Sequence, residues 1–190
     1  MTVSTELRDG AMLVTINRPE AGNALNPAVG QGLVDAMNEA ATNPEVRTVI
    51  VTGAGEKVFC AGMDLKAFAS GEDLSAVGKS LAMLSSFAKP VIAAVNGHAV
   101  AGGFEVMMRC DLVVAADHAR FGIPEVKRGL VAAGGGTRLP RRIPLAVALE
   151  LGLTGETIPA ARALELGLIN RVVPAAEVLD GALSLAALIN

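Results

Sequence analysis

Glu105 and Glu125 are the side chains of this sequence whose surroundings most favour acid–base chemistry. Glu105 follows two glycines in VAGGFEVMMRCD, where a helix is expected to begin among mostly apolar neighbours. Glu125 comes directly after Pro124, at the end of a strand-like run. Carboxylates in partly dry surroundings can give or take a proton at neutral pH. A simpler interpretation of Glu105 stays open, because an acid in the first turn also complements the helix dipole.

Two short loops can present free backbone amides to a ligand. Ala61-Gly62 precedes Met63-Asp64, and Asp64 is expected to be the N-cap of a new helix. Gly102 and Gly103 open the helix that carries Glu105. Amides at helix starts have no acceptor inside the helix, so they can hold an anion or a polarised carbonyl oxygen. An ordinary strand-to-helix turn is the alternative for the first loop.

A third segment, ARFGIPEVKRGLVAAGGGTRL, contains Glu125 and the glycine-rich run at 132–137. Glycines let the backbone approach a ligand or another helix closely. A flexible turn would use the same residues, and the local sequence does not separate the two interpretations.

The composition excludes several classes of function. The chain has 190 residues, a net charge of −3 and neither Trp nor Tyr, which argues against a nucleic-acid partner. No apolar run is long enough for a membrane span, and the first residues do not resemble a secretory signal. Two cysteines and two histidines have no metal-ligand spacing, so we expect no metal. The GAGEKV turn lacks the third glycine of a dinucleotide loop. A cytoplasmic location is expected.

Strand and helix signals alternate along the chain, which predicts a single α/β domain over 1–190 with a largely parallel sheet. A core of about 1–140 is followed by a helical region of about 141–190. We expect a hairpin around Arg8-Asp9-Gly10, a helix over 70–87 and one extended segment over 111–122. The pattern at 175–190 stops without a cap, so a helix is expected to run to the last residue.

These segments together resemble the enoyl-CoA hydratase/isomerase, or crotonase, superfamily. The resemblance covers almost the whole chain, through VTINRPEAGNALN, VTGAGEKVFCAGMDLKAF, KPVIAAVNGHAVAGGFEVMMRCDLVVA, ARFGIPEVKRGLVAAGGGTRL and LTGETIPAARALELGLINRVV. It implies a crotonase-like (ClpP/crotonase) fold, a spiral of ββα repeats followed by C-terminal helices. Members continue for several further helices, so the last of these are expected to be missing here.

The resemblance also implies roles for individual residues. The backbone N–H groups of Met63 and Gly102 would form an oxyanion hole for an acyl-CoA thioester, and Glu105 and Glu125 would be the catalytic pair. Further contacts to substrate or CoA are implied for the residues around the two loops, which are Ala61, Gly62, Asp64, Lys66 and Gly103. Two departures stand out. Glu20-Ala21-Gly22 replaces a segment that often carries a basic residue, and the run at Gly134 is about one residue short.

The implied activity is hydration of a 2-enoyl-CoA, with Glu105 activating the water and Glu125 exchanging a proton at C2. An enoyl-CoA isomerase, another crotonase-type acyl-CoA reaction and a non-catalytic acyl-CoA-binding protein are the alternatives. No cofactor is implied beyond the coenzyme A of the substrate. A homotrimer or a dimer of trimers is the implied assembly.

Overall fold

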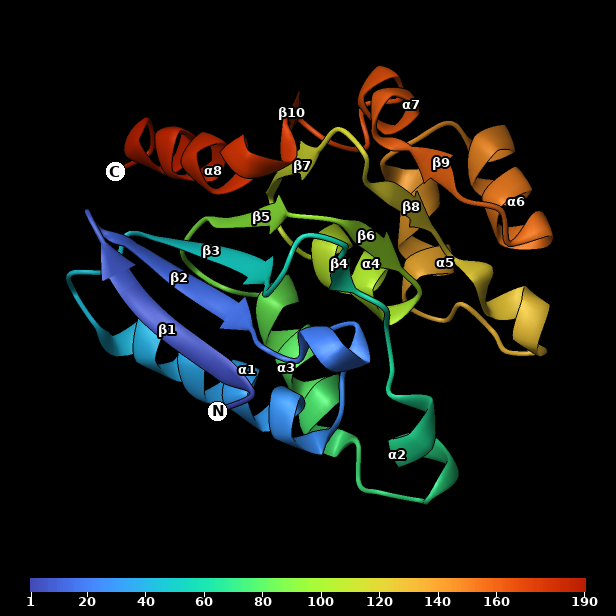
Figure 1. The fold of residues 1–190 in the computed structure, drawn as a ribbon, viewed down its shortest axis with the longest axis horizontal. Coiled ribbons are helices and arrows are strands. Elements are labelled where there is room, and N and C mark those ends of the chain that lie inside the picture. The colour runs from blue at the N-terminus through green and yellow to red at the C-terminus, as the bar shows by residue number, and fades with distance from the viewer.

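The computed structural model describes residues 1–190 and contains two β-sheets (Figure 1). The larger sheet has the order β1-β2-β3-β5-β7-β10. Its strands are β1 (Val3–Arg8), β2 (Ala11–Ile16), β3 (Thr48–Gly53), β5 (Val91–Val95), β7 (Leu112–Ala116) and β10 (Arg171–Val173). Only the β1–β2 pair is antiparallel. The largely parallel sheet predicted from the sequence is therefore confirmed.

The strand and helix signals alone did not predict the second sheet. It has the order β4-β6-β8-β9, and its strands are β4 (Val58–Cys60), β6 (His98–Val100), β8 (Arg120–Gly122) and β9 (Ile158–Pro159). Three times the chain passes from a strand of the larger sheet to one of the smaller sheet and then into a helical segment. This is the expected ββα spiral. The single extended segment predicted over 111–122 is wrong, because it divides into β7 and β8, which belong to different sheets.

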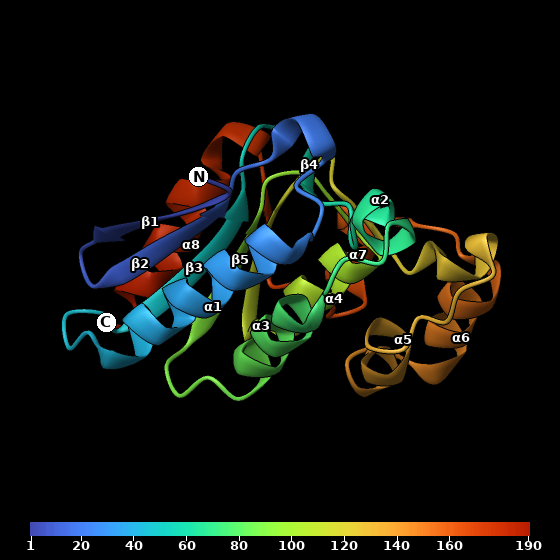
Figure 2. The same cartoon turned by 90° about the horizontal axis from the view of Figure 1, so that it is seen from below.

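Helices cover both faces of the larger sheet. α1 (Pro27–Thr42) and α3 (Ser75–Ser85) pack side by side on one face, and α8 (Val178–Ala187) packs on the other (Figures 1 and 2). The remaining helices are α2 (Leu65–Ala69), α4 (Gly102–Met108), α5 (Gly135–Arg138), α6 (Leu145–Thr154) and α7 (Ala160–Glu165). Short 3-10 turns are η1 (Pro19–Ala21), η2 (Pro124–Arg128), η3 (Leu139–Arg141) and η4 (Ala175–Glu177).

The predictions for the hairpin and for the ends of two helices had different outcomes. The hairpin at Asp9-Gly10 is confirmed, with both residues at positive φ, as a tight two-residue turn between twisted strands requires. The helix expected over 70–87 forms only as α3, because the chain turns at residues 70 and 71 and Asp73 accepts a hydrogen bond from Ser75 N at 2.8 Å just before the helix. The prediction of a helix running to the last residue is wrong. α8 ends at Ala187, and the Asn190 side chain instead donates to the carbonyl of Asp9 at 3.0 Å.

One apolar core holds these layers together. It comprises 49 buried residues that run from Val3 to Ala186 and include the interior-facing residues of both sheets. The helical region after residue 140 contributes Ile143, Leu151 and Ala182 to the same cluster. A continuous core of this kind fixes the ends of the strands relative to one another, and the loops at those ends carry the site described below. None of the helices is both long and apolar enough to span a bilayer.

Candidate active site

A pocket of about 540 Å³ lies where the loops after β4, β6 and β8 meet. Five of the residues singled out from the sequence line it, and these are Ala61, Met63, Gly102, Glu105 and Glu125. Most of the other lining residues are apolar, among them Leu25, Leu65, Phe68, Leu81, Leu130 and Val131. A smaller hollow of about 270 Å³, beside Phe87 and Lys89, contains none of the five. The larger pocket is therefore the candidate site.

The amide of Met63 is left free by the way its loop is held. Leu25 and Met63 form an isolated parallel bridge, in which Leu25 N donates to Gly62 O at 2.8 Å and Asp64 N donates to Leu25 O at 2.9 Å. Successive amides of an extended chain point in opposite directions. The N–H of Met63 therefore points away from Leu25, and it donates to no other group of the chain.

The amide of Gly102 lies against the same loop. Gly102 is the first residue of α4, whose first intrahelical bond runs from Glu105 N to Ala101 O at 3.0 Å. A Cβ atom on Gly102 would stand 3.3 Å from Met63 N, so the two loops approach each other with backbone alone. Ala101 reaches this geometry at a φ of 50°, a conformation that costs a non-glycine residue about 1–3 kcal/mol. Two unpaired amides thus border one pocket.

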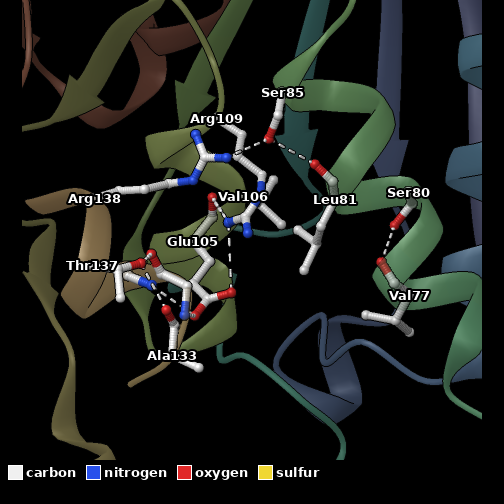
Figure 3. Close-up of polar contacts among 12 residues, drawn as sticks. Val77, Ser80, Leu81, Ser85, Glu105, Val106, Arg109, Ala133, Thr137 and Arg138 are labelled. Carbon is white, nitrogen blue, oxygen red and sulfur yellow. Dashed lines mark hydrogen bonds and ion pairs between the residues drawn. The ribbon is translucent and has the colours of Figure 1, made fainter. Parts of the chain in front are cut away.

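Glu105 is held by the glycine-rich segment and by Arg109 at the end of its own helix (Figure 3). Its Oε1 accepts hydrogen bonds from Gly134 N and Gly135 N, both at 2.8 Å. Its Oε2 lies 3.5 Å from Nη1 of Arg109. The interpretation of Glu105 as a simple complement to the start of α4 therefore does not describe its contacts. The close approach expected of the glycine-rich segment is confirmed, and its partner is Glu105.

Glu125 lines the same pocket, at the start of η2. Burial raises the pKa of its carboxyl, and the negative charge of Glu105 raises it further. Its Oε2 is buried and has no hydrogen-bond partner. A carboxyl group in this setting holds its proton more readily than an exposed one, which suits a proton donor at neutral pH.

Four residues singled out from the sequence do not line the pocket. Asp64 caps α2 through Lys66 N at 3.0 Å and pairs with Nη1 of Arg18 at 3.0 Å, which confirms the predicted N-cap. Gly62 has a φ of 99° and shapes the loop before Met63. Gly103 is buried so close to the carbonyl of Cys60 that any Cβ would overlap it. The Lys66 side chain is exposed. Contacts of these residues with CoA stay a prediction.

Sequence reasoning missed Arg109 and the two amides that hold Glu105. Arg109 lies four residues after Glu105, and this i, i+4 spacing places opposite charges on one helix face. That signal was present in the sequence. The contact from Gly134 joins residues 29 positions apart, and no local pattern predicts it.

Comparison with known proteins decides the family. The sequence model described as Enoyl-CoA hydratase/isomerase matches residues 6–190. The chain belongs to the enoyl-CoA hydratase/isomerase family. An (E)-benzylidenesuccinyl-CoA hydratase of Thauera aromatica is 42% identical to this family member over 164 residues, 83% of this chain and 64% of the relative. A carnitinyl-CoA dehydratase of Salmonella arizonae is 44% identical over 155 residues, 78% of this chain and 59% of the relative.

Solved structures agree with this placement and with the crotonase-like fold. A carnitinyl-CoA dehydratase from Mycobacterium avium superposes with a TM-score of 0.94 at 52% identity, covering 99% of this chain and 76% of that one. An enoyl-CoA hydratase from Mycobacterium tuberculosis gives the same TM-score and identity, covering 99% of this chain and 75% of that one. This family member spans about 59–64% of the length of the two curated relatives.

Proposed function

We propose that this chain carries the catalytic centre of an enoyl-CoA hydratase, which adds water across the C2–C3 double bond of a 2-enoyl-CoA thioester. The observation that carries the proposal is the meeting of Glu105, Glu125 and the amides of Met63 and Gly102 around one pocket. Those four groups come from three loops that are far apart in the sequence. The names of the relatives, which are hydratases and dehydratases of CoA thioesters, support the same class of reaction.

The two amides would bind the thioester carbonyl oxygen. In that position they polarise the conjugated enoyl system, so that C3 becomes electrophilic and the oxygen gathers charge as water adds. A donor aimed at a developing oxyanion contributes about 3 kcal/mol to lowering the barrier in related acyl chemistry. Met63 N–H supports this role because it has no acceptor within the chain. Ala61 and Gly62 would border the CoA moiety beside this loop, with Asp64 and Lys66 close by in the sequence and Gly103 next to Gly102.

The two carboxyl groups would divide the proton transfers. Glu105, with Oε1 already occupied by two amides, would accept a proton from the attacking water through Oε2, and the water oxygen would bond to C3. Glu125 would deliver a proton to C2 as the enolate collapses. Its raised pKa, caused first by burial and then by Glu105, supports the donor role. The proton taken by Glu105 then returns to the Glu125 carboxylate through solvent, which restores both groups.

Incubation with a panel of acyl-CoA thioesters tests the proposal, with the products identified by mass spectrometry. A 3-hydroxyacyl-CoA formed from a 2-enoyl-CoA supports hydration. A product of unchanged mass with a displaced double bond would assign the chain to isomerisation, and binding of CoA esters without turnover would mark it as a non-catalytic binding protein. Glu125→Gln is expected to lower the hydration rate by at least about 100-fold.

The proposed reaction needs no cofactor besides the coenzyme A of the substrate. Assembly as a homotrimer or a dimer of trimers and a cytoplasmic location stay predictions. Size-exclusion chromatography with light scattering measures the first of these directly.

A further inference from the structure

Arg109 is a largely buried cation on a helix whose other side chains are mainly apolar. It lies at the end of α4, and Phe104, Val106 and Met107 of the same helix are fully buried. The Arg109 side chain is 11% exposed. Its Nη1 donates to the carbonyl oxygen of Glu105 at 3.0 Å and lies 3.5 Å from Glu105 Oε2. Figure 3 shows the guanidinium facing that carboxylate.

Hydrogen bonds do not fully compensate for burying this charge. Burial lowers the pKa of Arg109, and the nearby positive charge of Arg138 acts in the same direction, whereas Glu105 opposes both. Nε of Arg109 is buried without an acceptor. An apolar side chain of similar volume would avoid the cost of desolvating a guanidinium at this place. Glu105 is the one carboxylate with which Arg109 forms an ion pair, so the contact with Glu105 is where its charge acts.

The other contacts of Glu105 show what that charge adds. Gly134 N and Gly135 N both donate to Oε1, and they leave Oε2 without any backbone donor. Donors at a single oxygen fix its position but leave the carboxylate plane free to turn about it. Arg109 lies beside the second oxygen and so restricts that rotation. Arg109 does not line the pocket, so it acts on the site only through Glu105.

We propose that Arg109 is a positioning residue, which holds the carboxylate of Glu105 in the orientation at which Oε2 receives the proton of the attacking water. This inference rests on the proposed hydration reaction and extends it by one residue. Because the substrate does not touch Arg109, the interaction changes the rate of the chemical step and leaves substrate binding nearly unaltered. Arg109 thus differs from the groups that border the pocket.

Steady-state kinetics of Arg109→Met on crotonyl-CoA tests the role. We expect kcat to fall by about 10- to 100-fold with KM within about twofold of the parent, since a misplacement of about 1 Å costs rates of this size. Arg109→Lys, which restores a cation near Oε2, should recover part of the loss. Arg138→Met is the matched control, because Arg138 donates to Ser85 Oγ and not to Glu105. The control is expected to keep the parent kcat.

A comparison in the Glu105→Gln background separates positioning from a structural role. If Arg109 acts only through Glu105, adding Arg109→Met to Glu105→Gln leaves the residual rate unchanged. If Arg109→Met instead disrupts the fold, the double variant loses further rate. An unchanged kcat in the single variant, or an equal loss in both backgrounds, would overturn the inference while leaving hydration intact. If the parent chain hydrates no 2-enoyl-CoA, the proposed function fails and the positioning role fails with it.

Discussion

Gly134 donates its N–H to Oε1 of Glu105 at 2.8 Å, and a Cβ atom on Gly134 would overlap the same carboxylate. The residue that holds Glu105 can therefore only be glycine in this geometry. Glu105 is tied by this contact to a segment outside its own helix, which aligns its carboxylate with the pocket shared with Glu125.

The first prediction follows from that contact. Gly134→Ala should displace the Glu105 carboxylate and lower kcat by about 10- to 100-fold, because a general base must stay within hydrogen-bond reach of its proton. Kinetics on a 2-enoyl-CoA measures the loss. Gly136→Ala is the control, since its Cβ would meet only Ala132 Cβ at 3.4 Å. Equal activity of the two variants would contradict the assigned role of Gly134.

From the raised pKa of Glu125 we predict that Glu125→Gln loses activity but gains stability at higher pH. The native state binds the Glu125 proton more tightly than the unfolded chain does, so ionising the carboxyl above its usual value of 4.5 costs stability. Glutamine carries no such proton. We expect Glu125→Gln to gain unfolding free energy relative to the parent as the pH rises from about 4 to about 8, while activity is lost. Urea unfolding at several pH values measures this.

The control for that series is Glu150→Gln, which alters an exposed acid of α6. Its unfolding free energy should follow that of the parent at every pH. A stability difference for Glu125→Gln that stayed constant with pH would argue against a carboxyl that folding makes harder to ionise.

Asp64 links helix capping to the position of the Met63 amide. Its carboxylate accepts from Lys66 N and Ala67 N and pairs with Arg18. Asp64→Ala removes the cap and should lower the unfolding free energy by about 1 kcal/mol, with kcat reduced because the neighbouring loop loosens. Thermal unfolding and kinetics measure the two effects. Asp64→Asn, which keeps the capping oxygen, should lose less stability; equal losses would exclude the capping role.

The cysteines are predicted to be unreactive in the native state. Burial raises the pKa of both Cys60 and Cys110 to about 12, and only the thiolate attacks disulfides and alkylating reagents. An aromatic disulfide reagent should therefore label neither thiol before denaturation and both afterwards. Prompt labelling of the folded protein would show that β4 or the end of α4 opens readily.

Local chemistry explains what could be predicted from the sequence. The turn at Asp9-Gly10 and the cap at Asp64 depend on residues adjacent in the chain, and both are confirmed. The meeting of Glu105 with Glu125 was expected only through the family resemblance. Its geometric basis, a pocket shared by three loops, depends on the packing of the whole core.

Long-range contacts explain which features could not be predicted from the sequence. The continuous apolar run of β7 indicates a strand, but it does not say that the chain then enters a second strand, β8, in a different sheet. The periodic pattern at the last residues is that of a helix, yet Asn190 bonds to Asp9, 181 positions away, and α8 ends earlier. The hydrogen bond from Gly134 N to Glu105 is another contact between residues far apart in the sequence.

Isotope labelling of the product tests the central claim most directly. Crotonyl-CoA incubated with the protein in water enriched in oxygen-18 and deuterium should give a 3-hydroxyacyl-CoA with one heavy oxygen at C3 and one deuterium at C2. Glu105→Gln and Glu125→Gln should each suppress that product. A product with a displaced double bond and no heavy oxygen would contradict hydration by this pair of carboxylates. So would a labelled product that still forms in each of the two variants.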